Sequence, residues 1–171
     1  GFFPLSENYH QDGILIKTIA PAILEEKTEL DLRSKAKALS ENLNFYGIIA
    51  IELFELNNGD IVFNEIAPRP HNSGHLTIQS HSISQFGLLG EIVSNKKISK
   101  PLSNKKAVMK NILGEFFNKK NYKEILNEIK NMDNHYLKLY NKEDAKTGRK
   151  MGHVTIITDD IENSLVKINA L

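Results

Sequence analysis

Two apolar runs on either side of a turn signal constrain the fold of this chain more than any other feature. Residues 47–54 read GIIAIELF, residues 61–63 read IVF, and Asn57-Asn58-Gly59-Asp60 lies between them. β-Branched and aromatic residues favour strands, and an Asn-Gly step is a strong hairpin signal. The sequence therefore predicts two antiparallel strands. Counting outward from the turn places Glu52 opposite Glu65, with Cβ atoms about 5 Å apart.

Two carboxylates that face each other repel unless a cation lies between them. Magnesium takes oxygen ligands and usually keeps substrate phosphates in its coordination shell. We therefore predict that Glu52 and Glu65 are metal ligands. The alternative at this point is a pair on the solvent face of the sheet, with its repulsion relieved by water.

The segment that follows the second strand carries unusually dense polar chemistry. Residues 64–75 read NEIAPRPHNSGH, in which two prolines stiffen a loop rich in charged and amide side chains. The guanidinium of Arg69 can hold a planar anion through two parallel hydrogen bonds. A salt bridge from Arg69 to Glu65 that only orders the loop is the alternative. Together with the carboxylates, this loop indicates a site for a metal and an anionic substrate.

Composition limits the possible functions. The 171 residues include 40% hydrophobic residues, 22 basic and 21 acidic residues and no cysteine. A net charge of +1 argues against a nucleic-acid partner, and the lack of cysteine excludes disulfides and thiolate metal sites. No apolar run approaches the about 20 residues of a membrane span, and no secretory signal is present. We expect a cytoplasmic protein without a membrane partner, and the start at Gly1 suggests a piece of a longer chain.

Hydrophobic periodicity divides the chain into predicted strands and helices. The predicted strands outside the hairpin are residues 13–20, 107–113, 135–140 and 153–158. The predicted helices are residues 24–43, 84–93, 121–132 with an Asn121–Glu124 capping box, and 161–168. The inward residues of the second helix are predicted to be Phe86, Leu89, Ile92 and Val93. The basic stretch 95–106, NKKISKPLSNKK, interrupts this pattern. We therefore predict an α+β fold with a first domain at residues 1–95, a linker at 96–106 and a small α+β domain at 107–171.

The polar loop also resembles the signature of a known family. NEIAPRPHNSGH is similar to the corresponding motif of 5-(carboxyamino)imidazole ribonucleotide synthases, which belong to the ATP-grasp superfamily. Further segments that resemble this family, in the same order, are PLSENYHQDGIL and TIAPA within residues 4–22, IELF at 51–54, SQF at 84–86, NILG at 111–114, and LYNK with RKMGH within 139–153. The resemblance implies the C-terminal part of an ATP-grasp domain, an antiparallel sheet with flanking helices, followed by a small α+β domain.

The resemblance implies a reaction in de novo purine biosynthesis. In that reaction ATP, with Mg²⁺, phosphorylates bicarbonate to carboxyphosphate, and the carboxyl group passes to the amine of 5-aminoimidazole ribonucleotide. The family also implies a homodimer of the whole protein. The glycine-rich loop, phosphate-binding lysine and adenine hinge of the family have no counterpart in the chain. We therefore expect the 171 residues alone to be inactive.

The resemblance also implies roles for individual residues. They are Glu52 and Glu65 for the metal; His10, Asn64 and Glu65 for ATP; Arg69, His71, Asn72 and Ser73 for bicarbonate or carboxyphosphate; and Lys142 and Arg149 for the ribonucleotide. Arg69, His71 and Lys142 would be the catalytic residues, whereas Lys150 is expected to point elsewhere. The chain departs from the family pattern at Lys138, in place of histidine, and at Asn141, in place of glycine. Because asparagine tolerates left-handed backbone, we expect the turn at Asn141 to survive.

Two other functions are compatible with parts of the pattern. Another ATP-grasp ligase, of the glycinamide ribonucleotide transformylase or biotin carboxylase type, would share the two-carboxylate hairpin. A non-catalytic binding module would use the lysine-rich surface, although the balanced charge argues against it. The residues after His71 and the RKMGH run favour the aminoimidazole enzyme.

Overall fold

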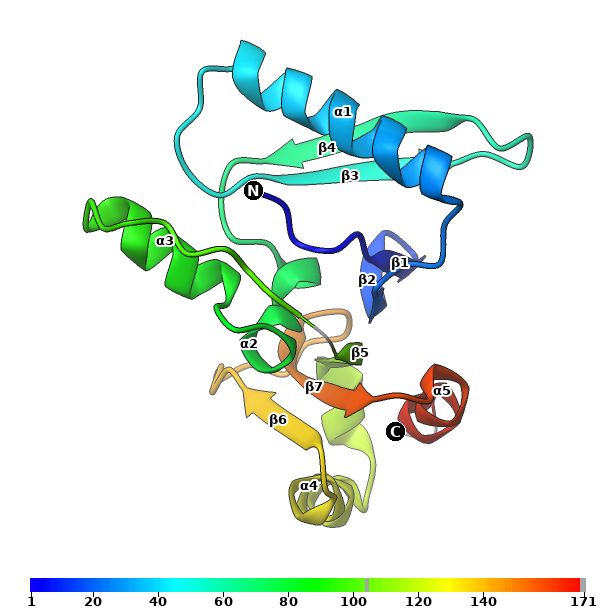
Figure 1. Ribbon diagram of the computed structural model, residues 1–171. Coiled ribbons are helices and arrows are strands. Elements are labelled where there is room, and N and C mark those ends of the chain that lie inside the picture. The colour runs from blue at the N-terminus through cyan, green and yellow to red at the C-terminus, as the bar shows by residue number, and fades with distance from the viewer. Residues whose placement is uncertain (104, 170–171) are drawn as a thin grey trace.

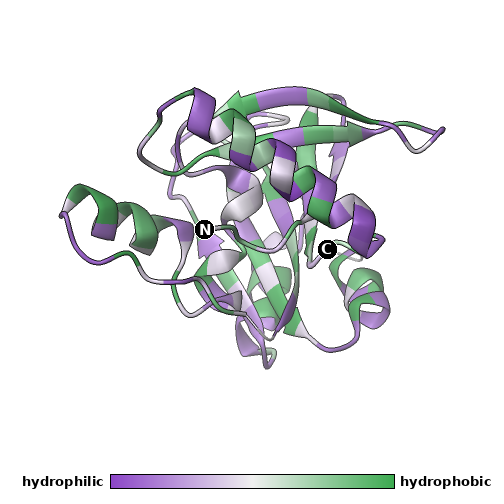
Figure 2. Cartoon of the chain, turned by 45° about the horizontal axis from the view of Figure 1, so that its top comes forward, coloured by the Kyte–Doolittle hydropathy of each residue, from purple (hydrophilic) through white to green (hydrophobic). Residues whose placement is uncertain are grey.

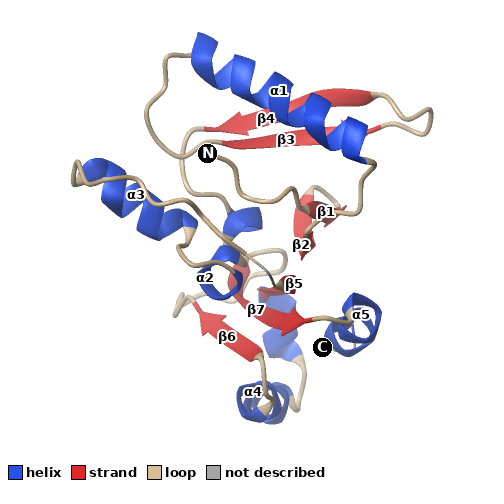
Figure 3. Ribbon diagram, in the orientation of Figure 1, coloured by secondary structure: helices blue, strands red, loops and turns tan. Residues whose placement is uncertain are grey.

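A computed structural model describes residues 1–103 and 105–169 of the chain and shows an α+β fold with two antiparallel sheets (Figures 1 and 3). Five strands form one sheet in the order β1-β2-β5-β7-β6, and β3 pairs with β4 in the other. The strands are β1 (Glu7–Gln11), β2 (Ile14–Ala20), β3 (Ala50–Glu55), β4 (Ile61–Ala67), β5 (Lys106–Leu113), β6 (His135–Leu139) and β7 (Lys150–Thr158). The α-helices are α1 (Glu26–Asn42), α2 (Thr77–Ser80), α3 (Gln85–Val93), α4 (Tyr122–Asn131) and α5 (Ile161–Asn169), with short 3-10 helices η1 (Asn72–Gly74) and η2 (Gly114–Asn118). The predicted fold class is confirmed.

The hairpin predicted from the sequence is present as β3 and β4, and α1 lies across it (Figure 1). Both strands carry hydrophobic and hydrophilic residues (Figure 2). The face toward α1 carries Ile51 and Leu53 of β3 and Ile61 and Phe63 of β4, which line a cavity of about 240 Å³ together with Leu32, Lys35, Ala36 and Leu39 of the helix. The opposite face carries the exposed pair Phe54 and Val62 near the turn and Glu52 with Glu65 farther along the strands.

The five-stranded sheet buries a core on each of its faces. One cluster joins the sheet to α4 and α5 through Ile129 and Ile168, and it includes Ile19, Val108, Val154 and Ile156. The other cluster joins Ala107 and Met109 of β5 to Ala20 and to Leu76, which follows the polar loop. Val108 lies between Ala107 and Met109 and faces the opposite side, as the pleat requires. The polar loop is thus anchored on one face of this sheet.

The large sheet includes strands from both sides of the predicted linker. Residues Lys17–Ala20 of β2 pair antiparallel with Lys110–Ala107 of β5. The predicted segments 1–95 and 107–171 therefore do not form separate sheets. Local sequence patterns could not show this, because they do not specify which distant strands pair. Part of the stretch between them is also held in place, since the amide and hydroxyl of Ser99 both donate hydrogen bonds of 2.7 Å to the carboxylate of Glu91 in α3.

Two local predictions were wrong. Phe86 and Val93 are 44% and 75% exposed, whereas Gln85 and Leu88 are the buried residues of α3. This helix packs against α2 and the polar loop instead of covering a sheet. The buried side of α3 is therefore not the most apolar side of the helix. Asn121 begins α4 without a side-chain capping bond. Its φ of −102° and ψ of 19° do not have the extended geometry that lets a capping side chain reach the helix amides.

None of the helices in the described residues is both long enough and apolar enough to cross a bilayer.

Candidate metal and anion site

A β-bulge at Asn64 brings the two carboxylates to the same face of the hairpin. Leu53 pairs with Phe63 and Glu52 pairs with Glu65, so Asn64 is the extra residue of β4. Phe63 faces α1, and regular alternation would turn Glu65 toward the helix as well. The extra residue reverses this alternation, as bulges near functional sites often do. The predicted pairing of Glu52 with Glu65 is confirmed.

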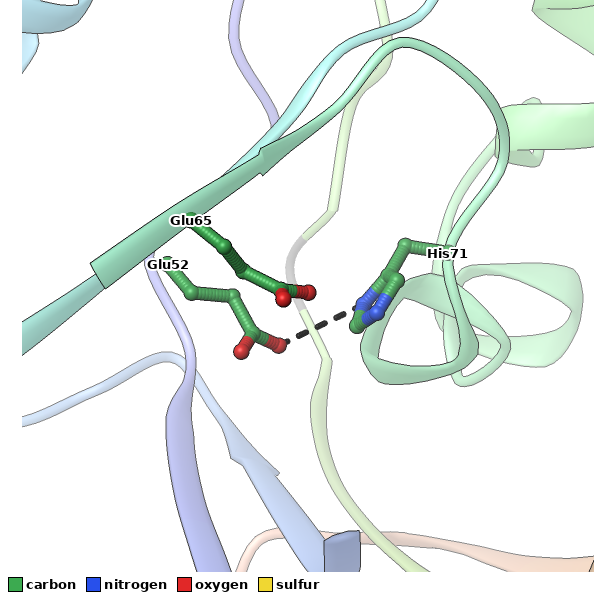
Figure 4. Close-up of side chains that lie close together, drawn as sticks. All are labelled: Glu52, Glu65 and His71. Atoms are coloured by element: carbon green, nitrogen blue, oxygen red, sulfur yellow. Dashed lines mark ion pairs between the residues drawn. The ribbon is translucent and has the colours of Figure 1, made fainter. Parts of the chain in front are cut away.

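Three side chains meet on this face (Figure 4). Glu52, Glu65 and His71 each offer one ligand atom, and these atoms lie within 4.8 Å of one another. His71 Nδ1 lies 3.5 Å from Glu52 Oε1, and both side chains are almost buried, with 12% and 13% of their surface exposed. Glu52 Oε1 is buried without a hydrogen-bond partner among the described residues. A carboxylate oxygen in that state is costly unless a cation compensates it.

The protonation of His71 strengthens this interpretation. Burial lowers the pKa of His71, and the nearby Glu52 carboxylate only partly opposes that effect. In the neutral tautomer with its proton on Nε2, Nδ1 accepts from the backbone amide of Ser73 at 3.4 Å and contacts the Ser73 hydroxyl at 2.9 Å. Nδ1 and Glu52 Oε1 then direct lone pairs into the same small space. The two glutamates suit a hard cation such as Mg²⁺, which prefers oxygen ligands.

Positive groups surround this cluster. The charges of Arg69 and Lys150 both act on His71 and lower its pKa. Arg69 is exposed and donates to the carbonyl of Pro70 at 3.0 Å; in the described part of the chain no ion pair joins it to Glu65. Lys150 is half-buried at the start of β7, where burial lowers its pKa and Glu52 raises it. The charges of Lys150 and Glu52 thus act on each other, while the expectation that Lys150 points away from the ribonucleotide stays a prediction.

Residues 140–149 form a loop that carries Lys142 and Arg149. Lys142 Nζ donates to the carbonyl of Lys150 at 2.7 Å, and Arg149 Nη1 donates to the carbonyl of Asp144 at 3.1 Å. Gly114 holds this loop close, since a Cβ atom there would lie 2.0 Å from the backbone oxygen of Lys146. Asn141 has a φ of 53°, which confirms that asparagine supports the left-handed turn. The loop holds Lys142 against the start of β7, while Arg149 stays exposed at the end of the loop.

Of the remaining predicted residues, His10 lies apart from the metal cluster, whereas Asn72 and Ser73 lie beside it. His10 lies exposed on β1, opposite Leu15, and the described contacts do not link it to the carboxylates. Asn72 and Ser73 lie in η1 beside His71. Asn72 forms a pair of amide hydrogen bonds with Asn111 of β5, of 3.0 and 2.6 Å. Asn72 therefore tethers the loop to the large sheet.

The family of the chain follows from comparison with known proteins. Residues 1–86 match the family described as the ATP-grasp domain, and residues 107–167 match the phosphoribosylaminoimidazole carboxylase C-terminal domain. The chain belongs to the ATP-grasp family. The resemblance noted in the sequence, to the 5-(carboxyamino)imidazole ribonucleotide synthases of that family, is confirmed by both matches and by the relatives.

These ATP-grasp relatives are similar over nearly the whole chain. The N5-carboxyaminoimidazole ribonucleotide synthase of Staphylococcus aureus strain COL is 36% identical over 169 residues, which cover 95% of this chain and 42% of the relative. A crystal structure of an ADP complex of an N5-carboxyaminoimidazole ribonucleotide synthetase is 40% identical, with a TM-score of 0.88 over 98% of this chain and 43% of that one. The Aspergillus clavatus enzyme in complex with ADP and 5-aminoimidazole ribonucleotide is 27% identical, with a TM-score of 0.79 over 96% and 45% of the two chains. This chain thus spans less than half the length of the relatives that it matches.

Several residues of this ATP-grasp site carry no obvious signal in the sequence. Gln85 hydrogen bonds to the backbone of His71, and Asn111 holds Asn72. The ring of His75 packs against the rings of Phe86, Tyr140 and His153. Tyr140 Oη and His153 Nδ1 lie at a hydrogen-bond distance of 2.8 Å. These contacts join the polar loop to the 140–149 loop. Each of these residues lies in a segment that resembles the family, and that resemblance was the one available signal. Their structural roles depend on neighbours far away in the sequence.

Proposed function

We propose that this chain supplies the metal, bicarbonate and ribonucleotide sites of an ATP-dependent ligase of de novo purine biosynthesis. The ligase converts 5-aminoimidazole ribonucleotide to 5-(carboxyamino)imidazole ribonucleotide. The observation that carries the proposal is the cluster of Glu52, Glu65 and His71 beside a rigid cationic loop, in a chain that matches both family domains. The ADP and 5-aminoimidazole ribonucleotide in the Aspergillus clavatus complex support the choice of ligands.

Each step of this reaction balances without a redox partner. The γ-phosphoryl group of ATP passes to an oxygen of bicarbonate, which gives carboxyphosphate and ADP. The carboxyl carbon then forms a bond to the exocyclic amine of the ribonucleotide, the bond from that carbon to the phosphate oxygen breaks, and the amine loses a proton.

The residues of the chain divide the binding work. Glu52 and Glu65 would hold Mg²⁺, which when bound neutralises charge on the transferring phosphates. Asn64, Glu65 and His10 are assigned to ATP. The guanidinium of Arg69 and the Nε2–H of neutral His71 donate hydrogen bonds to bicarbonate, with Ser73 and Asn72 fixing the loop around it.

The ribonucleotide is assigned to the 140–149 loop. Lys142 and Arg149 would bind its phosphate, and the hydrogen bond from Lys142 to the carbonyl of Lys150 holds Lys142 against β7. A cytoplasmic location and a homodimer of the whole protein complete the proposal, and both follow from the resemblance to the family.

ATP turnover by the full-length protein tests the proposal. We expect turnover with Mg²⁺ and bicarbonate that increases when 5-aminoimidazole ribonucleotide is added and that is lost in Glu65→Gln. Glu55→Gln is the matched control, because Glu55 lies on β3 opposite Ile61 and outside the cluster. Turnover that responds to a different amine or acid would move the assignment to another ATP-grasp ligase.

A further inference from the structure

Gln85 offers no ligand atom to the metal cluster, yet its side chain holds the backbone of His71, the residue that completes the cluster. We infer that Gln85 is a positioning residue that fixes the His71 imidazole against Glu52. The geometric part of this inference stands on the structure itself. Its kinetic consequence, weaker use of bicarbonate when Gln85 is changed, rests on the proposed function.

The Gln85 amide forms three hydrogen bonds to the polar loop. Oε1 accepts from the backbone amide of His71 at 2.9 Å, and Nε2 donates to the backbone carbonyl of the same residue at 2.8 Å. Nε2 also lies 3.0 Å from Nδ1 of His75. Because the His71 amide can only donate, the orientation of the Gln85 amide is determined, and both Nε2 hydrogens are used. His71 is therefore held at both of its backbone polar groups by one side chain.

The surroundings of Gln85 leave its side chain little freedom. Gln85 is 4% exposed, and a Cβ atom at Gly74 would lie 2.6 Å from its Oε1. Its backbone amide donates to Thr77 Oγ1 at 3.1 Å, and that hydroxyl donates to the carbonyl of Gly74 at 2.6 Å. The amide therefore lies against the loop with no room for water between them.

The position of His71 depends on this contact. Asn72 anchors the next residue to β5. The backbone amide of His71 itself is held by Gln85, and its carbonyl accepts from Gln85 and from the amide of Gly74 at 3.0 Å. If Gln85 loses its amide, the backbone amide of His71 loses its partner in a half-buried loop, while the carbonyl keeps only the hydrogen bond from the amide of Gly74 at 3.0 Å. The loop must then move for the His71 amide to reach water. The His71 ring, now 3.5 Å from Glu52, would move with it. A displacement of about 1 Å in a positioned group can reduce a rate by about a hundredfold.

The test compares two glutamine variants of the full-length enzyme. Gln85→Met removes all three hydrogen bonds at nearly constant volume. Gln79→Met is the matched control, because Gln79 lies nearby in α2 and its Oε1 has no hydrogen-bond partner in the described residues. The kcat and the KM values for bicarbonate and for ATP are measured with the thermal unfolding midpoint, and a crystal structure of Gln85→Met gives the distance from His71 to Glu52.

We expect Gln85→Met to raise the KM for bicarbonate at least tenfold while the KM for ATP changes less than twofold, and we expect Gln79→Met to behave as wild type. A bicarbonate KM within twofold of wild type would overturn the inference. The inference would also be overturned if the loss of activity followed only the decrease in the fraction of folded protein, with both KM values unchanged. If Gln85→Met does not fold, Gln85→Glu serves in its place, since it retains the acceptor for His71 N–H and loses both donors.

The two proposals fail in different ways. If the wild-type protein shows no ATP turnover stimulated by 5-aminoimidazole ribonucleotide, the proposed function fails and the crystal structure decides the role of Gln85. A His71 ring displaced from Glu52 in Gln85→Met then supports the positioning role, and an unmoved ring overturns it.

Discussion

At the scale of single residues, the facing glutamates give this chain a site at the expense of stability. Like charges on directly opposed strand residues are destabilising, and here Glu52 Oε1 is also buried without a hydrogen-bond partner in the described residues. Functional sites commonly retain such unfavourable arrangements because a ligand compensates them. Glu52 and Glu65 should therefore lower the stability of the metal-free protein and raise its stability when a metal is bound.

Glu65→Gln should raise the free energy of unfolding by about 0.2–1 kcal/mol in a chelator, because it removes the repulsion. With Mg²⁺ in excess, wild type should gain more stability than the variant, because a ligand that binds only the folded state stabilises it. Urea unfolding in both conditions measures the effect, with Glu55→Gln as the control. An identical response of wild type and Glu65→Gln to Mg²⁺ would contradict the metal assignment.

Two buried histidines should make stability depend on pH. Burial lowers the pKa of His75 and of His153 to about 4, below the value of about 6.5 for an exposed histidine. Between these values the unfolded chain binds more protons, so the free energy of unfolding falls as the pH decreases from 6.5 toward 4. His153→Gln should flatten this decline in denaturant unfolding measured at several pH values. Parallel curves for variant and wild type would show that His153 takes up a proton in the folded state as easily as in the unfolded state.

At the scale of the elements, hydrogen bonds from two directions hold the polar loop. Gln85 holds it from α3, and Asn111 holds it from the centre of the large sheet. Asn111 is 3% exposed, and its amide nitrogen also donates to the carbonyl of Leu15 at 2.9 Å. One asparagine therefore joins β5, β2 and the loop that carries His71.

Asn111→Ala should cost about 1–3 kcal/mol, because it leaves buried polar partners unsatisfied. Asn127→Ala, on the exposed side of α4, is the control and should change stability by less than about 0.5 kcal/mol. In a double-mutant cycle, Asn72→Ala should lose most of its own effect once Asn111 is absent. Additive effects of the two substitutions would show that the loop is not tethered through this pair.

At the scale of the whole molecule, the shared sheet makes the two segments of the chain depend on each other. Ile19 of β2 and Val108 of β5 lie in one core cluster with residues of α4 and α5. Separating them would expose apolar surface and two unpaired strand edges, which are prone to aggregate. The predicted boundary at 96–106 therefore separates two segments in the sequence that share one sheet and one core in the structure.

Residues 1–97 and 98–171, produced as two chains, should associate into a complex that elutes with the size of the intact chain. Each part alone should be aggregated or unfolded by circular dichroism, because β2 and β5 lose their pairing. Two independently folded parts that do not bind each other would contradict this expectation. Under that outcome the predicted domains would be autonomous units.

Local patterns in the sequence determined the hairpin, most of the helices and strands, and the carboxylate pair. Each of these depends on residues that are close together in the chain, so periodicity and turn chemistry were sufficient to predict them. The segments that resemble the family indicated Arg69, His71 and Lys142 as site residues, and these roles stay predictions.

Only the tertiary structure decided how these residues act together. The bulge at Asn64 turns Glu65 toward Glu52, and β7, which pairs with β5, begins at Lys150, whose pKa the charge of Glu52 raises. Gln85 fixes His71 from a separate helix, and β2 joins the sheet of a segment that begins some 85 residues later. None of these contacts is local, and their geometry arises from packing and strand register, which a linear pattern does not specify.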